Sequence, residues 1–113
     1  MADALVPVGP SAAVVCRYTG TGATPVRSFA VPPSAFAPLV AEMDSTRWQV
    51  ITQPAVYSCP AWDGSEDLVR FAYPSGPDVT VAVDLGGCRF ATNGTRTVTG
   101  TDISQYLARW VGS

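Results

Sequence analysis

The most regular pattern of apolar and polar positions lies between residues 68 and 99. Segment 79–85 alternates strictly over seven residues, and in segment 68–73 the residues Val69, Phe71 and Tyr73 share one face with Arg70 on the other, which predicts strands with one buried and one wet face. Their apolar positions are Val69, Phe71, Tyr73, Val79, Val81, Val83 and Leu85. Asn93 and Gly94 form the strongest short turn signal in the chain, because both residues tolerate positive φ. They predict a hairpin that pairs residues 88–92 with residues 95–99.

Two helices are predicted from apolar stripes with spacing i, i+3, i+4 and i+7. The first stripe follows an N-cap at Ser34 and consists of Phe36, Leu39, Val40 and Met43. Pro38 fits this helix only in its first turn, where the missing N–H group costs little. The second helix is expected after Asp102 as N-cap, with Gln105 at the capping-box position. Its stripe consists of Ile103, Tyr106, Leu107 and Trp110.

Further strands are expected at residues 12–18, 26–31 and 48–51, and the following segment QPAVYSCP at 53–60 is a candidate for another strand that ends at Cys59. We therefore predict an α+β fold: an antiparallel sheet of about four to five strands, with two short amphipathic helices packed on one face. Residues 1–11 contain Pro7, Gly9 and Pro10 without periodicity, so we expect a disordered tail or linker there. Residues 12–113 then form a single α+β domain, a size that allows one hydrophobic core.

Composition narrows the function classes. Only 14% of the residues are charged and the formal net charge is −2, with no cluster of arginines, which argues against nucleic acid and anionic membranes as partners. No window approaches the roughly 18 apolar residues of a membrane span. The chain has no lysine and no histidine. Histidine is the side chain most often used for proton transfer near neutral pH and for metal ligation, so we expect neither a cofactor nor a metal site.

The three cysteines, Cys16, Cys59 and Cys88, are too far apart for a metal site and have no histidine to activate a thiolate. We expect a structural disulfide between Cys59 and Cys88, which flank the two alternating segments. A bridge over this loop would add roughly 3–4 kcal/mol in the chain-entropy model. Pairings of Cys16 with Cys59 or with Cys88 stay open. A disulfide of any pairing indicates an oxidising, extracytoplasmic compartment.

Three segments carry a resemblance to a known group of proteins: CRYTG at 16–20, CPAWDGSEDLVRFAYPSG at 59–76 and VDLGGCRFATNG at 83–94. They resemble uncharacterised secreted or lipoprotein-type domains of actinobacteria, which share a C-R-Y start, a C-P-x-x-D-G-S turn and a G-C-R-x-x-T-N-G end. The likeness covers about half of the chain. It implies an exported domain, and no activity or catalytic residue comes with it.

The candidate binding residues are aromatic and acidic. Exposed aromatic side chains on a rigid sheet would form a platform for a glycan or a protein partner, whereas buried ones would only close the rim of the core. The candidates for partner binding are Trp62, Tyr57, Trp48 and Asp63, and Trp62 is the side chain we most expect to be exposed. Asp63 belongs to an oxygen-rich segment, 63–67, that lacks the spacing of an EF-hand and reads best as a solvated turn.

These observations favour a non-enzymatic exported domain that binds or scaffolds an unidentified partner at the cell envelope. The alternative from another class is a secreted protease inhibitor, in which the proline-rich segment QPAVYSCPAW at 53–62 presents a rigid loop. We expect no enzyme, because no catalytic constellation of nucleophile, base and oxyanion donors is recognisable.

Overall fold

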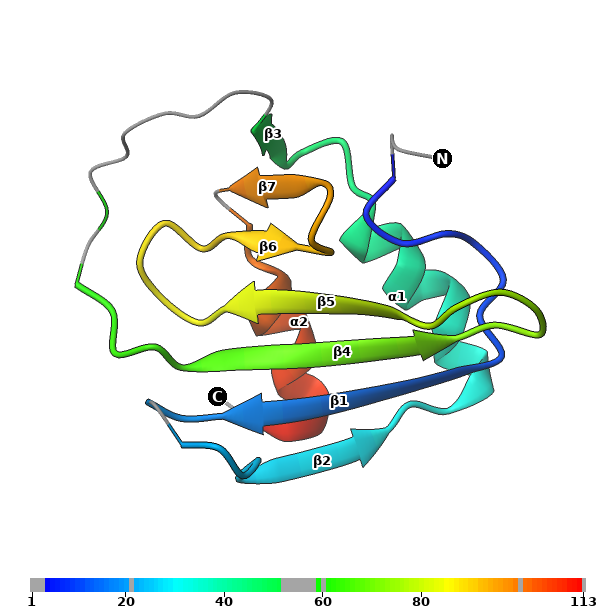
Figure 1. Cartoon of the computed structure of the whole chain (residues 1–113), viewed down its shortest axis with the longest axis horizontal. Helices are drawn as coiled ribbons and strands as arrows, with labels where there is room; N and C mark the ends of the chain where they lie inside the picture. The colour runs from blue at the N-terminus through cyan, green and yellow to red at the C-terminus, as the bar shows by residue number, and fades with distance from the viewer. Residues whose placement is uncertain (1–3, 21, 52–58, 60, 100, 113) are drawn as a thin grey trace.

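The computed structural model describes residues 4–20, 22–51, 59, 61–99 and 101–112. Within these residues the chain forms seven strands, two α-helices and one short 3-10 helix (Figure 1). The strands are β1 Ala12–Tyr18, β2 Arg27–Ala30, β3 Gln49–Ile51, β4 Glu66–Ala72, β5 Val79–Asp84, β6 Ala91–Thr92 and β7 Thr97–Thr99. The helices are η1 Pro33–Ala35, α1 Phe36–Met43 and α2 Ile103–Val111.

All seven strands belong to one antiparallel sheet with the order β2-β1-β4-β5-β6-β7-β3. The predicted antiparallel sheet with two helices is therefore confirmed, but the prediction of about four to five strands is wrong. Strands β2, β3, β6 and β7 are two to four residues long. Each lies within a segment expected to be extended, at 26–31, 48–51, 88–92 or 95–99, but the sequence pattern does not show that all of them pair into one sheet.

The predicted alternation sets which face of the sheet is buried. Val15 of β1, Val69 and Phe71 of β4 and Val81 and Val83 of β5 have no exposed surface. Both helices lie on this face, behind the sheet in Figure 1. They bury the residues Leu39, Val40, Met43, Ile103, Leu107 and Val111. Full burial of one such side chain is worth about 1.5–3 kcal/mol, so this layer is the main source of stability.

The ends of the two helices differ in part from their predicted caps. Pro38 is the third residue of α1, inside the first turn, as its missing N–H group requires. Ser34 lies inside η1 rather than at an N-cap. Asp102 is the N-cap of α2, but its side chain makes no cap hydrogen bond. The carbonyl of Asp102 instead accepts from the N–H groups of Gln105 and Tyr106.

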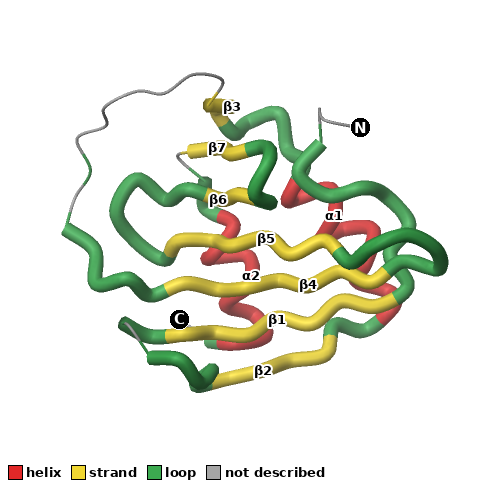
Figure 2. The backbone as a smooth tube through the Cα atoms, viewed as in Figure 1, coloured by secondary structure: helices red, strands yellow, loops and turns green. Residues whose placement is uncertain are grey.

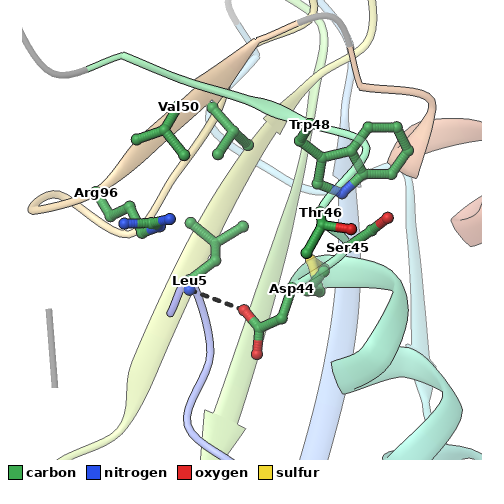
Figure 3. A pocket seen from close by; sticks show the side chains of 9 residues that line it. Leu5, Asp44, Ser45, Thr46, Trp48, Val50 and Arg96 are labelled. Atoms are coloured by element: carbon green, nitrogen blue, oxygen red, sulfur yellow. Dashed lines mark hydrogen bonds between the residues drawn. The ribbon is translucent and has the colours of Figure 1, made fainter. Parts of the chain in front are cut away.

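The N-terminal segment contributes to the core. Leu5 and Val6 are fully buried. The N–H group of Leu5 donates to Asp44 Oδ1 at 2.8 Å (Figure 3), and the N–H group of Val6 donates to the same oxygen at 2.9 Å. Because Asp44 directly follows α1, these bonds attach the segment to the end of that helix. Residues 5 and 6 thus belong to the folded domain, in contrast to the disordered tail or linker predicted over residues 1–11.

The predicted hairpin at Asn93 and Gly94 is present, with a longer loop than a two-residue turn. Ala91 pairs with Val98 and Thr92 with Thr97, so residues 93–96 form the loop. Of the two turn residues only Gly94 has positive φ, at 93°. Asn93 acts through its side chain, whose Oδ1 accepts from the N–H groups of Thr95 and Arg96, both at 2.8 Å. An Asx turn replaces the second positive-φ residue.

An ion pair lies within the buried face of the sheet. Arg17 and Asp67 face each other across β1 and β4 and are 7% and 0% exposed. Arg17 Nε donates to Asp67 Oδ1 at 2.8 Å and Nη2 donates to Oδ2 at 3.0 Å. Arg17 Nη1 also donates to the carbonyl of Gly112, directly after α2. The pair therefore joins two central strands to the end of a helix.

Removal of one partner should destabilise the fold strongly. Arg17→Met leaves the Asp67 carboxylate buried and unpaired, so we expect the free energy of unfolding in urea to fall by about 3–5 kcal/mol. The double variant Arg17→Met, Asp67→Leu should recover most of this loss. The control Arg47→Met breaks the surface pair with Glu42 and should cost about 1 kcal/mol or less. Equal losses in the two single variants would contradict a structural role for the buried pair.

Candidate functional site

A disulfide joins Cys59 to Cys88, with their Cα atoms 5.0 Å apart. This confirms the predicted pairing and leaves Cys16 as a free thiol. The bridge ties the segment before β4 to the loop between β5 and β6, and both lie at the left end of the sheet in Figure 2. Cys16 is half-buried on the sheet face away from the helices, where its Sγ lies 3.7 Å from Ser28 Oγ.

Ser65 organises the turn that leads into β4. Its carbonyl accepts from Trp62 Nε1 at 2.9 Å and from the N–H group of Leu85 at 3.0 Å. Its hydroxyl accepts from the N–H group of Gly20 at 3.0 Å. Its own N–H group donates to Asp63 Oδ1 at 2.9 Å. Four hydrogen bonds from three segments of the chain therefore hold this turn in one conformation.

Trp62 is the exposed aromatic of this turn, with 44% of its surface accessible. One side of its ring packs against Gly86, where an added Cβ would come within 2.9 Å of Trp62 Cδ1. A glycine at this position is therefore what allows the indole to lie against the loop. The ring borders a shallow hollow of about 650 Å³, called the Trp62 depression below. It is lined by Ala61, Trp62, Asp63, Ser65, Leu85 and Gly86.

The two carboxylates nearest this end of the sheet differ in their electrostatics. Hydrogen bonding with Ser65 lowers the pKa of Asp63 below its ordinary value, so this exposed side chain is ionised at neutral pH. Asp84 is half-buried at the end of β5, directly opposite Glu66 of β4. Burial, and then the charge of Glu66, raise the pKa of Asp84 to about 6. Asp84 does not line the Trp62 depression, so the two aspartates do not share this site.

The other predicted aromatic residues do not join Trp62. Trp48 is 8% exposed, donates from Nε1 to the carbonyl of Glu42 at 2.9 Å, and lies under the guanidinium of Arg47. It borders a separate cavity of about 260 Å³ beside Leu5 and Asp44 (Figure 3). Trp48, one of the predicted partner-binding residues, is therefore a member of the hydrophobic core. Tyr57 lies outside the described residues.

A further aromatic residue near Trp62 in the sequence, Tyr73, is separated from it by a strand. Tyr73 follows β4, where its hydroxyl donates to the carbonyl of Pro7 at 2.8 Å, whereas Trp62 precedes β4. A strand of this length spans about 20 Å, so the two rings lie at opposite ends of the sheet. Of the four predicted binding residues, the structure brings Trp62 and Asp63 together in one hollow.

Sequence reasoning missed the residues that position Trp62. Ser65 and Gly86 do so through hydrogen bonds and close packing between segments that are far apart in the chain. The consecutive glycines in LGGC, at 85–88, were a usable signal, because a glycine often marks a close approach of side chain and backbone. The predicted inhibitor segment, 53–62, lies mostly outside the described residues.

Comparisons of the chain with protein-family models, with curated proteins and with solved structures found no match. None of the helices in the described part of the chain has the length and apolar character needed to span a membrane. Among the same residues, no three His, Cys, Asp or Glu side chains are grouped as metal ligands would be.

The Asp84 pKa predicts a pH-dependent stability. The folded protein keeps the Asp84 proton up to about pH 6, whereas the unfolded chain releases it near the ordinary value of 3.8. Ionisation therefore costs folding stability as the pH rises from about 4 to 6, and the cost is absent below this window. Asp84→Asn should raise the urea midpoint at pH 7 and leave it unchanged near pH 3.

Solvent screening limits the gain in Asp84→Asn to about 1 kcal/mol at pH 7. Asp78→Asn, in the exposed turn between β4 and β5, is the matched control for the change in net charge. A gain of the same size at both pH values, or an equal gain in the control, would show that the raised pKa of Asp84 is not its cause.

Proposed function

We propose that this chain is a non-enzymatic, exported domain that recognises a glycan or protein partner at the cell envelope through the Trp62 depression. The supporting observation is the way Trp62 is held. Its N–H group is bonded to Ser65 and one side of its ring packs on Gly86, while 44% of the side chain stays accessible. A large aromatic side chain that is already fixed loses little conformational entropy when a partner binds.

The chemistry beside the ring suggests what such a partner presents. The indole N–H is used internally, so the ring offers a partner its apolar surface. Asp63 adds an ionised, exposed carboxylate that accepts hydrogen bonds. A flat apolar surface next to an acceptor fits a sugar ring with its hydroxyl groups, or an aliphatic side chain with a donor, better than it fits an anion.

Export is supported by the Cys59–Cys88 disulfide, because such bridges persist in oxidising compartments and are rare in the cytosol. The resemblance to secreted actinobacterial domains points the same way and includes both bridged cysteines. The fixed Trp62 ring supports a binding role and the disulfide supports export, and neither role needs a catalytic group.

Trp62→Ala should weaken binding without unfolding the domain. The test measures co-sedimentation with insoluble peptidoglycan, chitin and cellulose, and we expect retention on at least one polymer for the unchanged protein. Loss of an aromatic anchor typically costs 2 kcal/mol or more, so retention should fall at least about tenfold. Val8→Ala is the control, because Val8 is 82% exposed and lines a different surface.

Unchanged retention in Trp62→Ala, or an equal loss in Val8→Ala, would contradict a role for Trp62. Binding to none of the three polymers would remove the glycan partner and leave a protein partner. Inhibition of subtilisin or trypsin at near-stoichiometric amounts would instead favour the protease inhibitor.

Export predicts a defined thiol pattern. In protein recovered from an oxidising medium, alkylation without reductant followed by peptide mass mapping should label Cys16 and leave Cys59 and Cys88 unlabelled. Protein produced in a reducing cytosol should label all three cysteines and unfold at lower denaturant concentration, because the loss of a native bridge in a small domain costs about 2–5 kcal/mol. Three free thiols in the protein from the oxidising medium would remove the physical basis for export.

A further inference from the structure

A second pocket lies on the helix side of the same end of the sheet. It has a volume of about 370 Å³ and is called the Arg89 pocket below. Its lining comprises Arg17, Leu85, Arg89, Ser104, Gln105 and Ala108. Arg17 comes from β1, the last three from α2, and Leu85 and Arg89 from the loop between β5 and β6. The described residues that line it contribute two guanidinium groups, a hydroxyl and an amide, and none of them is acidic.

The backbone of Arg89 has an unusual conformation. Its φ is 55°, and no other non-glycine residue in the described part of the chain has a positive φ. This conformation costs an L-residue about 1 kcal/mol or more. The N–H group donates to the carbonyl of Gly86 at 3.1 Å, and the carbonyl accepts from Thr101 N and Oγ1 at 3.4 and 3.3 Å. The disulfide at Cys88 holds the preceding residue.

This backbone geometry calls for a glycine, which would make the same backbone hydrogen bonds without strain. The loop already contains Gly86 and Gly87. An arginine at the strained position therefore contributes something through its side chain. Within the described residues, the Arg89 guanidinium makes no ion pair or hydrogen bond. Arg89 is exposed, and it lines the pocket.

The remaining polar groups of the pocket are also available as donors. Arg17 uses three of its five N–H groups, two on Asp67 and one on the carbonyl of Gly112, which leaves one on each terminal nitrogen. The Asp67 carboxylate neutralises its charge, so the net positive charge of the pocket comes from Arg89. Ser104 and Gln105 make no side-chain hydrogen bond within the described residues. Donors from these four side chains converge on the pocket, and none of the described residues that line it is a carboxylate.

We propose that the Arg89 pocket binds an oxyanion, the carboxylate, phosphate or sulfate group of a small ligand. Arg89 would supply the charge and a forked pair of N–H donors, and Ser104 and Gln105 would add neutral hydrogen bonds. The buried guanidinium of Arg17 forms the rigid wall. The proposal does not depend on the role of Trp62, although Leu85 borders both the pocket and the Trp62 depression.

The test titrates the disulfide-bonded domain with sodium phosphate, sulfate, acetate and glucuronate, at an ionic strength held constant with sodium chloride. Amide chemical shifts of Arg89, Ser104 and Gln105 report binding. We expect saturable shifts with phosphate and sulfate if the group is tetrahedral, or with acetate and glucuronate if it is a carboxylate. Arg89→Gln should weaken the affinity about tenfold, because a charge-assisted fork is replaced by a neutral donor.

Two further variants separate binding from folding and from net charge. Arg89→Gly relieves the positive φ, so its melting temperature should equal or exceed that of the unchanged protein while saturable binding is lost. Arg70→Gln removes the same charge from an exposed position of β4 on the opposite face and should change the affinity less than about twofold. No saturable shift with any of the four anions, or equal losses in Arg89→Gln and Arg70→Gln, would overturn the proposal.

Discussion

The buried Arg17–Asp67 pair is the contact on which the arrangement of the central strands and of α2 depends. Two charges out of water are tolerated only when their hydrogen bonds are satisfied, and the forked contact across β1 and β4 meets that condition. A slip of one residue would move either partner to the other face of the sheet and leave its mate buried alone. The third bond, to the carbonyl of Gly112, places the end of α2 over the same strands. Register and helix position are thus coupled.

The end of the sheet next to this pair is fixed by contacts of a different kind. Tyr18, Glu66 and Asp84 lie opposite one another in neighbouring strands, so the segments that follow β1 and β5 and precede β4 meet there. The hydrogen bonds of Ser65 connect these three segments, and the Cys59–Cys88 bridge closes the arrangement. Loops stabilised in this way keep side chains in place without help from a helix or strand. Trp62 and Arg89 both depend on that rigidity.

The extent to which the fold was predictable follows from the range of the interactions involved. Alternation in β4 and β5 is local, and it correctly indicated which face would be buried. The position of β1 between β2 and β4 depends on long-range pairing that alternation does not specify. Burial of Leu5 and of Trp48 depends in the same way on distant partners. Arg17 and Asp67 did carry a signal, since each occupies the apolar phase of its strand, after Ala13 and Val15 and before Val69 and Phe71.

The distribution of titratable groups bears on what kind of site this end of the sheet forms. Among the described residues, Asp84 is the carboxyl group with its pKa raised to about 6. It lines neither the Trp62 depression nor the Arg89 pocket. Asp63, which does line the depression, is held ionised, and an arginine does not transfer protons at physiological pH. Groups with fixed charge beside an immobilised aromatic ring suit recognition, because affinity then rests on shape and hydrogen bonding. The Trp62 depression is thus bordered by a carboxylate and the Arg89 pocket by a guanidinium, so the two hollows favour ligand groups of opposite charge.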